Sequence, residues 1–330
     1  MTKIRFGVLG TAKINGAVVP AIHAAKNAEC VAIASRDLAK AQAHAQKHEI
    51  PQALGSYEAL LESDIDAVYI PLPNHLHLPW AKRFLEAGKH VYLEKPACLR
   101  PSEVQTLLAT AEQYKRVLIE GFMYRHHPQF TRALEIIQSG VLGEIRLVRS
   151  SFSFPLEAPE NIRWVRSYGG GALYDLGCYC INATLLLLGK TPKRAIASCR
   201  QGGVTQSNEY SDLTTSAILE FDSADGNGAY GIFECSIAMP NRQHLEVVGA
   251  KGVLELPEFV HPSNEIGTLV LNGNTEKTIR ANRYQLLVEH LADVANGEAE
   301  LQFGKPTDST NPLAQAKVIE MVQQAMGYSL

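Results

Sequence analysis

The sequence predicts an α/β Rossmann domain with a doubly wound parallel sheet, followed by an α+β domain with a predominantly antiparallel open sheet. Up to about residue 122, short apolar runs alternate with helical patterns, which is typical of parallel strands covered by helices on both faces. From about residue 193, apolar runs are separated only by turn segments such as "SADGNG" and "LNGN", which favours antiparallel strands. The change of rhythm near Tyr124 places the domains at 1–123 and 124–330.

In the first domain, each apolar run has the length of a strand and each stretch between runs can hold a helix. Pro20 suits the first turn of a helix, so we expect the first helix to begin near Val18, after a longer loop. The expected strands are "IRFGVLG", "CVAIAS", "AVYIPLP", "HVYLEKP" and "VLIEGF", and the expected helices are 18–27, 37–48, 77–88 and 101–114.

The second domain begins with a helix and a strand, "PQFTRALEIIQSG" and "EIRLVRSSFSF". The Gly-rich run "SYGGGALYDLGCYCINATLLLLG" then predicts a loop that leads into a helix. Helical patterns at 282–296 and 311–326 close the chain, and it stays open whether they pack back on the first domain. The strands expected between are "RAIASCRQ", "LTTSAILEFD", "GAYGIFECSIAM", "HLEVVGAKGVLEL" and "GTLVLNG".

Composition excludes several classes of protein. The chain has 330 residues, 46% of them hydrophobic and 20% charged, with a net charge of −3, so it lacks the basic excess of a nucleic-acid-binding protein. No run of 18 apolar residues suggests a membrane span, and the first residues have the pattern of a strand. Six cysteines form no C-x-x-C. We expect a cytoplasmic protein with no membrane or nucleic-acid partner.

The first strand leads into a candidate phosphate-binding turn, "VLGTAKINGAVVPAI". A dinucleotide turn favours G-x-G-x-x-G, because glycines let backbone N–H groups approach the pyrophosphate at a helix N-terminus. Gly10 fits the first glycine, whereas Ala12 and Asn15 stand at the second and third. The motif alone is weak, and a plain strand-turn-helix is the alternative. Its place at the start of a βαβ pattern favours a nucleotide.

The second strand ends in "AIASRD", where an acidic residue would bind the ribose hydroxyls of NAD. Ser35 and Arg36 stand there instead, and a hydroxyl with a guanidinium suits a 2′-phosphate. This favours NADP. The alternative is a solvated Arg36, with Asp37 binding the ribose of NAD.

Two more strands end in polar residues, in "IPLPNHLHLPW" and "YLEKPA". In open α/β sheets ligands lie outside the carboxyl ends of strands, so both segments should face one crevice. Glu94 and Lys95 at a buried strand end would be costly unless they are paired or used. His75 and His77, or His126 and His127, have metal-like spacing, but no Cys, Asp or Glu accompanies them in a recognised pattern, so we expect no metal.

Further along, "GGGALYDLGCY" separates Asp175 and Tyr179 by four residues. On an α-helix the two side chains would share one face. An acid and a tyrosine so placed can serve proton exchange, or they can be an ordinary packing pair.

Taken together, "GTAKI", "IASR", "IPLPNHLH", "AGKHVYLEKP" and "GGGALYDLGCY" resemble the Gfo/Idh/MocA family of glucose-fructose oxidoreductase and inositol dehydrogenase, over nearly the whole chain. With "NIRW" before the glycine run and Tyr179, the resemblance is nearest to the branch of dihydrodiol dehydrogenase, NADP-dependent xylose dehydrogenase and glucose-fructose oxidoreductase. Many relatives have His where this chain has Tyr179, so an inositol substrate is not carried over.

The resemblance implies roles for individual residues. Lys95 would polarise the reacting oxygen, with Glu94 and Pro96 holding the turn, and its ammonium would favour the phenolate of a nearby Tyr179. Tyr179 would exchange the hydroxyl proton, and Asp175 would orient the sugar hydroxyls or the tyrosine. Candidate substrate-binding residues are Tyr124, Arg125, His127, Asp175 and Tyr179. Candidate cofactor-binding residues are Gly10, Thr11, Ala12, Lys13, Ile14, Ser35, Arg36, Leu72, Pro73, Asn74, His77, Glu94, Lys95, Met123, Arg163 and Trp164.

The function that the resemblance implies is hydride transfer between nicotinamide, with NADP preferred and NAD as the alternative, and a sugar, polyol or small diol or carbonyl compound. Two other readings stay open. One is a sugar-processing enzyme that oxidises its substrate only transiently before an elimination. The other is a non-catalytic dinucleotide-binding sensor. Apolar residues at both alternating sets of "LTTSAILEF" and "GIFECSIAM" further predict a homodimer or homotetramer through the C-terminal sheet.

Overall fold

The computed structural model describes residues 2–158, 160–202, 210–223, 226–305 and 308–327. The chain forms two compact units. The first unit consists of Met1–His126 with Asn282–Gly304, and the second of His127–Ala281 with Lys305–Leu330. A segment from late in the chain therefore belongs to the first unit. The domain assignment 1–123 and 124–330 stays a prediction.

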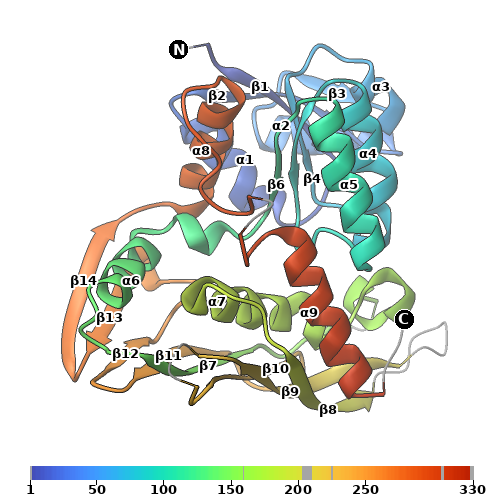
Figure 1. Ribbon diagram of the computed structural model, residues 1–330. Coiled ribbons are helices and arrows are strands. Elements are labelled where there is room, and N and C mark those ends of the chain that lie inside the picture. The colour runs from blue at the N-terminus through green and yellow to red at the C-terminus, as the bar shows by residue number, and fades with distance from the viewer. Residues whose placement is uncertain (1, 159, 203–209, 224–225, 306–307, 328–330) are drawn as a thin grey trace. The chain divides into compact units, whose positions relative to one another are not determined.

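The first unit has the parallel, doubly wound sheet that the sequence predicts, with strand order β3-β2-β1-β4-β5-β6. In Figure 1, α4 and α5 lie on one side of this sheet and α1 and α8 on the other. All its strands run in one direction, so their carboxyl ends meet at one edge. The elements are β1 (Ile4–Leu9), α1 (Asn15–Ala24), β2 (Ala28–Ala34), α2 (Leu38–Lys47), β3 (Gln52–Leu54), α3 (Tyr57–Leu61), β4 (Ala67–Ile70), η1 (Asn74–Leu76), α4 (His77–Glu86), β5 (His90–Leu93), α5 (Pro101–Gln113), β6 (Leu118–Glu120), η2 (Met123–His126) and α8 (Arg283–Ala295).

The expectation that the first helix begins near Val18 is wrong. Helix α1 begins at Asn15 and contains Pro20 in its interior. The Asn15 side chain donates to the carbonyl oxygen of Gly10 at 2.9 Å, which closes a short loop and starts the helix early. Pro20 removes one backbone donor, and the buried side chains of Val18, Val19 and Ile22 hold the helix on the core around it.

The second unit contains an eight-stranded sheet with order β14-β13-β12-β11-β7-β10-β9-β8. Every neighbouring pair is antiparallel except β7 with β10, which is parallel. Figure 1 shows α6, α7 and α9 on one side of this sheet. Its elements are α6 (Pro128–Gln138), β7 (Ile145–Ser153), η3 (Ile162–Trp164), η4 (Arg166–Tyr168), η5 (Leu173–Gly177), α7 (Cys178–Leu188), β8 (Arg194–Gly202), β9 (Ser211–Phe221), β10 (Ala229–Ser236), β11 (Arg242–Gly249), β12 (Val253–Leu256), η6 (Ser263–Glu265), β13 (Ile266–Leu271), β14 (Asn274–Arg280) and α9 (Pro312–Ala325).

The glycine run leads into two kinds of helix rather than one. Gly169 and Gly171 have positive φ angles of 76° and 104°, and the chain then forms a π-helix, η5, before α7. The stretch Arg166–Leu188 is long and apolar enough to cross a membrane, but 83% of its most apolar window is buried inside the protein, as in the core helix of a soluble protein. Asp175 lies in the π-helix and Tyr179 in α7, so the shared-face expectation, which assumed α-helical spacing, does not apply directly.

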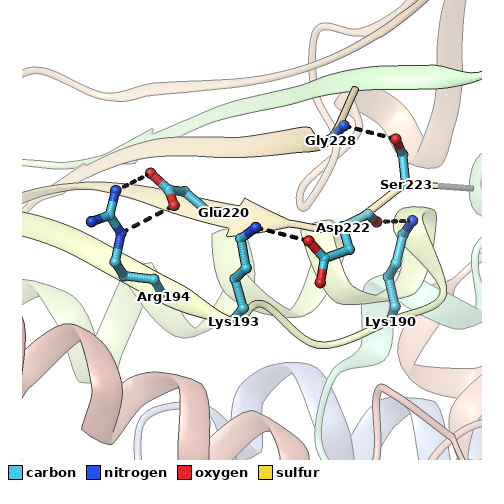
Figure 2. Close-up of polar contacts among 7 residues, drawn as sticks. All are labelled: Lys190, Lys193, Arg194, Glu220, Asp222, Ser223 and Gly228. Atoms are coloured by element: carbon cyan, nitrogen blue, oxygen red, sulfur yellow. Dashed lines mark hydrogen bonds and ion pairs between the residues drawn. The ribbon is translucent and has the colours of Figure 1, made fainter. Parts of the chain in front are cut away.

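The other face of the second sheet is open to solvent and carries apolar side chains beside ion pairs. Ile196 and Ile218 are paired across β8 and β9 and are 51% and 36% exposed. Figure 2 shows the outer end of these strands, where Arg194 binds Glu220 through two hydrogen bonds of 2.6 and 3.0 Å. In the same view Lys193 binds the carboxylate of Asp222 at 2.8 Å. Because these pairs are exposed, each contributes little to stability.

Candidate active site

The carboxyl ends of β1 and β4 are adjacent at the centre of the first sheet, where the strand order reverses. Gly10 follows β1 with a φ of +105°, and a Cβ there would lie 3.1 Å from Cδ2 of Leu72, which follows β4. Helix α1 has no side-chain cap and no acidic residue in its first turn, so nothing negative opposes an anion at its N-terminus. This geometry fits the pyrophosphate of a dinucleotide, with the loop Gly10, Thr11, Ala12, Lys13 and Ile14 around it.

The residues after β2 bear on the choice between a 2′-phosphate and a ribose diol. Asp37 is the N-cap of α2, and its Oδ1 accepts the N–H groups of Ala39 at 3.0 Å and Lys40 at 3.3 Å. Its carboxylate is therefore engaged with its own helix. Arg36 is exposed, and the Oγ of Ser35 accepts the N–H of Asp37 at 3.2 Å. A hydroxyl and a guanidinium thus stand at this strand end, as a 2′-phosphate would require.

His77 ties two strand ends together. Its Nε2 lies 2.8 Å from the carbonyl oxygen of Leu72, after β4, and its Nδ1 lies 3.0 Å from that of Pro96, after β5. The ring is fully buried, and burial lowers the pKa of His77 to about 4. His77 therefore links the segments after β4 and β5 in this structure, while its contact with a cofactor stays a prediction. Pro73 and Asn74 lie between, at the start of η1.

Glu94 and Lys95, which follow β5, are surrounded by hydroxyl groups and charge. Tyr69 donates its hydroxyl to Glu94 Oε1 at 2.8 Å, and the backbone N–H of Lys95 donates to Glu94 Oε2 at 3.3 Å. Burial, with the Glu94 charge next, raises the pKa of Tyr69 and Tyr92 well above the ordinary value and raises that of Tyr284. These tyrosines therefore stay neutral near Glu94.

Glu120, at the end of β6, is a buried acid that the sequence analysis missed. Its Oε1 accepts the N–H of Ala97 at 2.8 Å, two residues after Lys95, and its Oε2 has no hydrogen-bond partner. Burial raises the pKa of Glu120 to about 7, while the charges of Arg125 and Lys95 oppose the shift. Its signal in the sequence was the one that drew attention to Glu94, a carboxylate at the end of an apolar run.

In the second unit, Asp175 is paired with a predicted cofactor-binding residue. Arg163 donates its Nε–H to Asp175 Oδ2 at 2.5 Å and an Nη1–H to Asn161 Oδ1 at 3.4 Å. Tyr179 packs edge-to-face on Phe152 of β7, with ring centroids 5.5 Å apart. The unit therefore brings Asp175 and Arg163 together beside the helix that carries Tyr179.

The remaining predicted residues divide between the two units. Met123, Tyr124 and Arg125 lie in η2 in the first unit. His127 begins the second unit, where its Nδ1 accepts the N–H of Gln129 at 3.3 Å and its Nε2 lies 3.1 Å from the carbonyl oxygen of Glu265. Trp164 lies in η3 and donates its indole N–H to the carbonyl oxygen of Ala158 at 2.7 Å.

Within the part of the chain that the structure describes, no group of three His, Cys, Asp or Glu side chains is arranged to hold a metal ion. His126 instead packs against His290 and Phe303 in the first unit, with ring centroids 5.2 and 5.4 Å away. Burial lowers the pKa of His126 well below its usual range.

Two protein-family descriptions match the chain. Residues 4–122 match the oxidoreductase family with an NAD-binding Rossmann fold, and residues 130–255 match the GFO/IDH/MocA C-terminal domain. Together they cover most of the chain, one match lying in each unit.

The curated relatives and solved structures agree with this match. D-xylose 1-dehydrogenase (NADP(+)) 2 of Haloferax volcanii is 42% identical over 76% of this chain and 74% of its own length. Trans-1,2-dihydrobenzene-1,2-diol dehydrogenase of Xenopus laevis is 30% identical over 83% of this chain and 80% of its own length. The crystal structure of KijD10, a 3-ketoreductase from Actinomadura kijaniata with NADP and TDP-benzene, covers 98% of both chains at 29% identity and a TM-score of 0.86.

Proposed function

Because the chain belongs to the GFO/IDH/MocA family of oxidoreductases, we propose that it acts as an NADP-dependent dehydrogenase or reductase on a sugar, polyol or small diol. The enzyme is an NAD(P)-dependent oxidoreductase of the branch that holds xylose and dihydrodiol dehydrogenases. The observation that carries the proposal is the turn after β5. Lys95 follows β5, which lies beside β4 and so close to the place where the strand order reverses. Its backbone N–H donates to Glu94, and the N–H of Ala97 donates to Glu120, so two carboxylates fix the backbone of this turn.

In this proposal the bound nicotinamide supplies or accepts the hydride, and the protein binds, orients and moves a proton. Lys95 donates a hydrogen bond to the oxygen of the reacting carbon and stabilises negative charge on it. Tyr179 exchanges a proton between that oxygen and its own hydroxyl. Asp175, held by Arg163, orients the hydroxyl groups of the substrate. Tyr124, Arg125 and His127 are further candidates for substrate contact.

NADP is the cofactor that the end of β2 favours. The Asp37 carboxylate accepts two hydrogen bonds from its own helix, so it is poorly placed to bind a ribose diol as well. Arg36 can give a 2′-phosphate one or two charge-assisted hydrogen bonds. Of the similar proteins described above, the xylose dehydrogenase is named for NADP(+), and the ketoreductase was crystallised with NADP.

The substrate class divides into free and nucleotide-linked sugars. A xylose dehydrogenase and a dihydrodiol dehydrogenase act on small, free compounds, whereas the ketoreductase was crystallised with a TDP derivative. We favour a free sugar or diol, because the 42% identity to the xylose dehydrogenase extends over 76% of this chain, whereas the same identity to a dTDP-linked 3-reductase of Actinomadura kijaniata extends over 56%. Reduction of a nucleotide-linked ketosugar is the second candidate.

A substrate panel tests the proposal. Aldoses, polyols and vicinal diols with NADP, and TDP-linked ketosugars with NADPH, are followed by absorbance of the reduced cofactor. Turnover of a free sugar or diol is expected, and stoichiometric release of NADPH excludes a transient oxidation. If the protein binds the cofactor but turns over no compound of the panel, the result would instead support a non-catalytic dinucleotide-binding sensor.

Two substitutions, Lys95→Met and Tyr179→Phe, test the proposed roles of these side chains in catalysis. Each should lower kcat by about 10²–10⁴-fold, because a lost oxyanion or proton-transfer partner typically costs that much. Cofactor affinity, measured by fluorescence titration, should change little with Tyr179→Phe. Near-normal turnover in either variant would remove that residue from the mechanism.

We further propose that the enzyme is a cytoplasmic homo-oligomer. All six cysteines are free thiols, as is usual in a reducing compartment. The open face of the second sheet carries exposed apolar side chains, which fit a contact with a second copy.

A further inference from the structure

Asp212 is a buried carboxylate that no role assigned so far explains. It lies near the start of β9, is 1% exposed, and its side chain faces the segment that precedes the π-helix. Its Oδ2 accepts the backbone N–H of Leu173 at 2.7 Å and the hydroxyl of Thr215 at 2.7 Å. Its Oδ1 has no hydrogen-bond partner. Leu173 is the first residue of the π-helix that carries Asp175.

The carboxylate also packs directly against Gly171. A Cβ on Gly171 would lie 1.9 Å from Asp212 Oδ1, so no other residue fits there while Asp212 keeps its place. Gly171 connects the two members of the ion pair by its backbone. Its N–H donates to the carbonyl oxygen of Arg163 at 2.8 Å, and its carbonyl oxygen accepts the N–H of Asp175 at 3.2 Å.

Ser211, the residue before Asp212, binds the backbone next to Arg163, the other member of the ion pair. Ser211 donates its hydroxyl to the carbonyl oxygen of Trp164 at 3.0 Å, directly after Arg163. Two consecutive residues at one strand end thus fix the segments on which Arg163 and Asp175 stand. The Nε of Arg163 then lies 2.5 Å from Oδ2 of Asp175 and completes the ion pair between the two segments.

From this arrangement we infer that Asp212 is a positioning residue, which sets Asp175 by accepting the Leu173 N–H and packing on Gly171. The inference rests on the proposed function for the part that Asp175 plays in turnover. Burial raises the pKa of Asp212 to about 6, so at pH 8 the group is a carboxylate. An amide oxygen at the Oδ2 position could accept the same two hydrogen bonds, whereas alanine could accept neither.

The test compares Asp212→Ala with Asp212→Asn at pH 8. The Ala variant should lower kcat about 10- to 100-fold, because small displacements of an orienting group are costly, while the Kd for NADP is unchanged. Deuterium uptake in a peptide that spans 171–177 should rise without a rise elsewhere. The Asn variant should restore kcat to within about threefold of the wild type. Asp222→Ala, at the exposed far end of β9 (Figure 2), is the matched control and should change nothing.

Other outcomes overturn the inference. A folded Ala variant with wild-type kcat and uptake would show that Asp212 only packs, and equal losses in the Ala and Asn variants would show that the charge is what matters. If the Ala variant does not fold, Asp212→Ser, whose hydroxyl is too short to reach Leu173, takes its place. If the wild type turns over no substrate, the proposed function fails, and the uptake measurement alone decides the inference.

Discussion

At the scale of single residues, three carboxylates in the described part of the chain accept specific hydrogen bonds. Glu94 accepts hydrogen bonds from Tyr69 and from the Lys95 backbone, while Glu120 and Asp212 each hold a backbone N–H near a residue proposed to act in catalysis. An unpaired buried charge would cost several kcal/mol. For the Glu-Lys pair at this strand end, the structure gives the Glu94 carboxylate two hydrogen bonds, and the proposed function gives the Lys95 ammonium a use.

Cofactor choice is the first residue-scale prediction. If Ser35 and Arg36 bind a 2′-phosphate, kcat/KM with NADP should exceed that with NAD about tenfold or more, since each charge-assisted hydrogen bond contributes about 1.5–3 kcal/mol. Ser35→Asp should reverse the ranking, because the new carboxylate repels the phosphate and accepts ribose hydroxyls. Both values are measured at one ionic strength. A wild-type preference for NAD would mean that Asp37 or another acid binds the ribose.

Glu120 makes the stability of the protein depend on pH. Its pKa rises from 4.5 to about 7 on folding, so the folded state holds this proton more tightly than the unfolded state. The stabilisation is complete below pH 4.5 and is lost as the pH rises through 7, by up to about 3 kcal/mol. Glu120→Gln keeps an acceptor for Ala97 but cannot titrate.

Melting temperatures between pH 5 and 8 check this. The wild type should lose stability toward pH 8, and Glu120→Gln should flatten that decline. Glu112→Gln, exposed on α5, is the control and should follow the wild type. Parallel curves for all three proteins would place the folded pKa of Glu120 near its ordinary value.

At the scale of elements, the π-helix depends on Gly171. Alanine there must adopt a φ of +104° and displace the Asp212 carboxylate. Gly189, the C-cap of α7, also has a positive φ, of +67°, but open space around its Cβ position. Gly189→Ala should therefore cost about 1–2 kcal/mol for the left-handed backbone alone, and Gly171→Ala about 1–3 kcal/mol more for overpacking. Urea unfolding of both variants measures the difference, and equal losses would mean that Asp212 moves aside freely.

The elements also show what the sequence could predict. Most strands and helices with strong periodicity were expected close to their observed bounds, although "HLEVVGAKGVLEL", expected as one strand, forms the two antiparallel strands β11 and β12. The parallel first sheet and the predominantly antiparallel second sheet are confirmed. The start of α1 was predicted too late, because Pro20 was expected in the first turn of the helix. The Asn15 side chain closes the loop earlier, by its hydrogen bond to Gly10. Strand β14, "NTEKTIR", was missed because six of its seven residues are exposed and it lacks an apolar face.

In the candidate site, too, local motifs could be predicted from the sequence and long-range contacts could not. Lys95, Tyr179 and the loop after β1 belong to short motifs that can be recognised locally. The backbone N–H groups that donate to Asp212 and Glu120 lie 39 and 23 positions away in sequence, and such hydrogen bonds leave no periodic signal. The pairing of Arg163 with Asp175 was missed for the same reason, since both residues were singled out separately.

At the scale of the whole molecule, the open face of the second sheet predicts self-association. The register aligns Ile196, Ile218 and Ile232 across β8, β9 and β10, and continues the row with Arg149 and Glu246 on β7 and β11. Arg149 and Glu246 form an ion pair at 3.3 Å. An apolar row that ends in a paired charge suits a contact in which one copy covers the isoleucines of another.

Light scattering after size exclusion tests this at micromolar concentration. The wild type should elute as a dimer or tetramer, whose mass is a multiple of the 36.1 kDa chain. Ile218→Lys should shift the protein toward the monomer, because a lysine in the centre of the row would have to bury an unpaired charge on association. Val141→Lys, also exposed but outside the sheet, is the matched control and should keep the wild-type mass. A monomeric wild type, or an Ile218→Lys variant that associates as the wild type does, would mean that this face stays open to solvent.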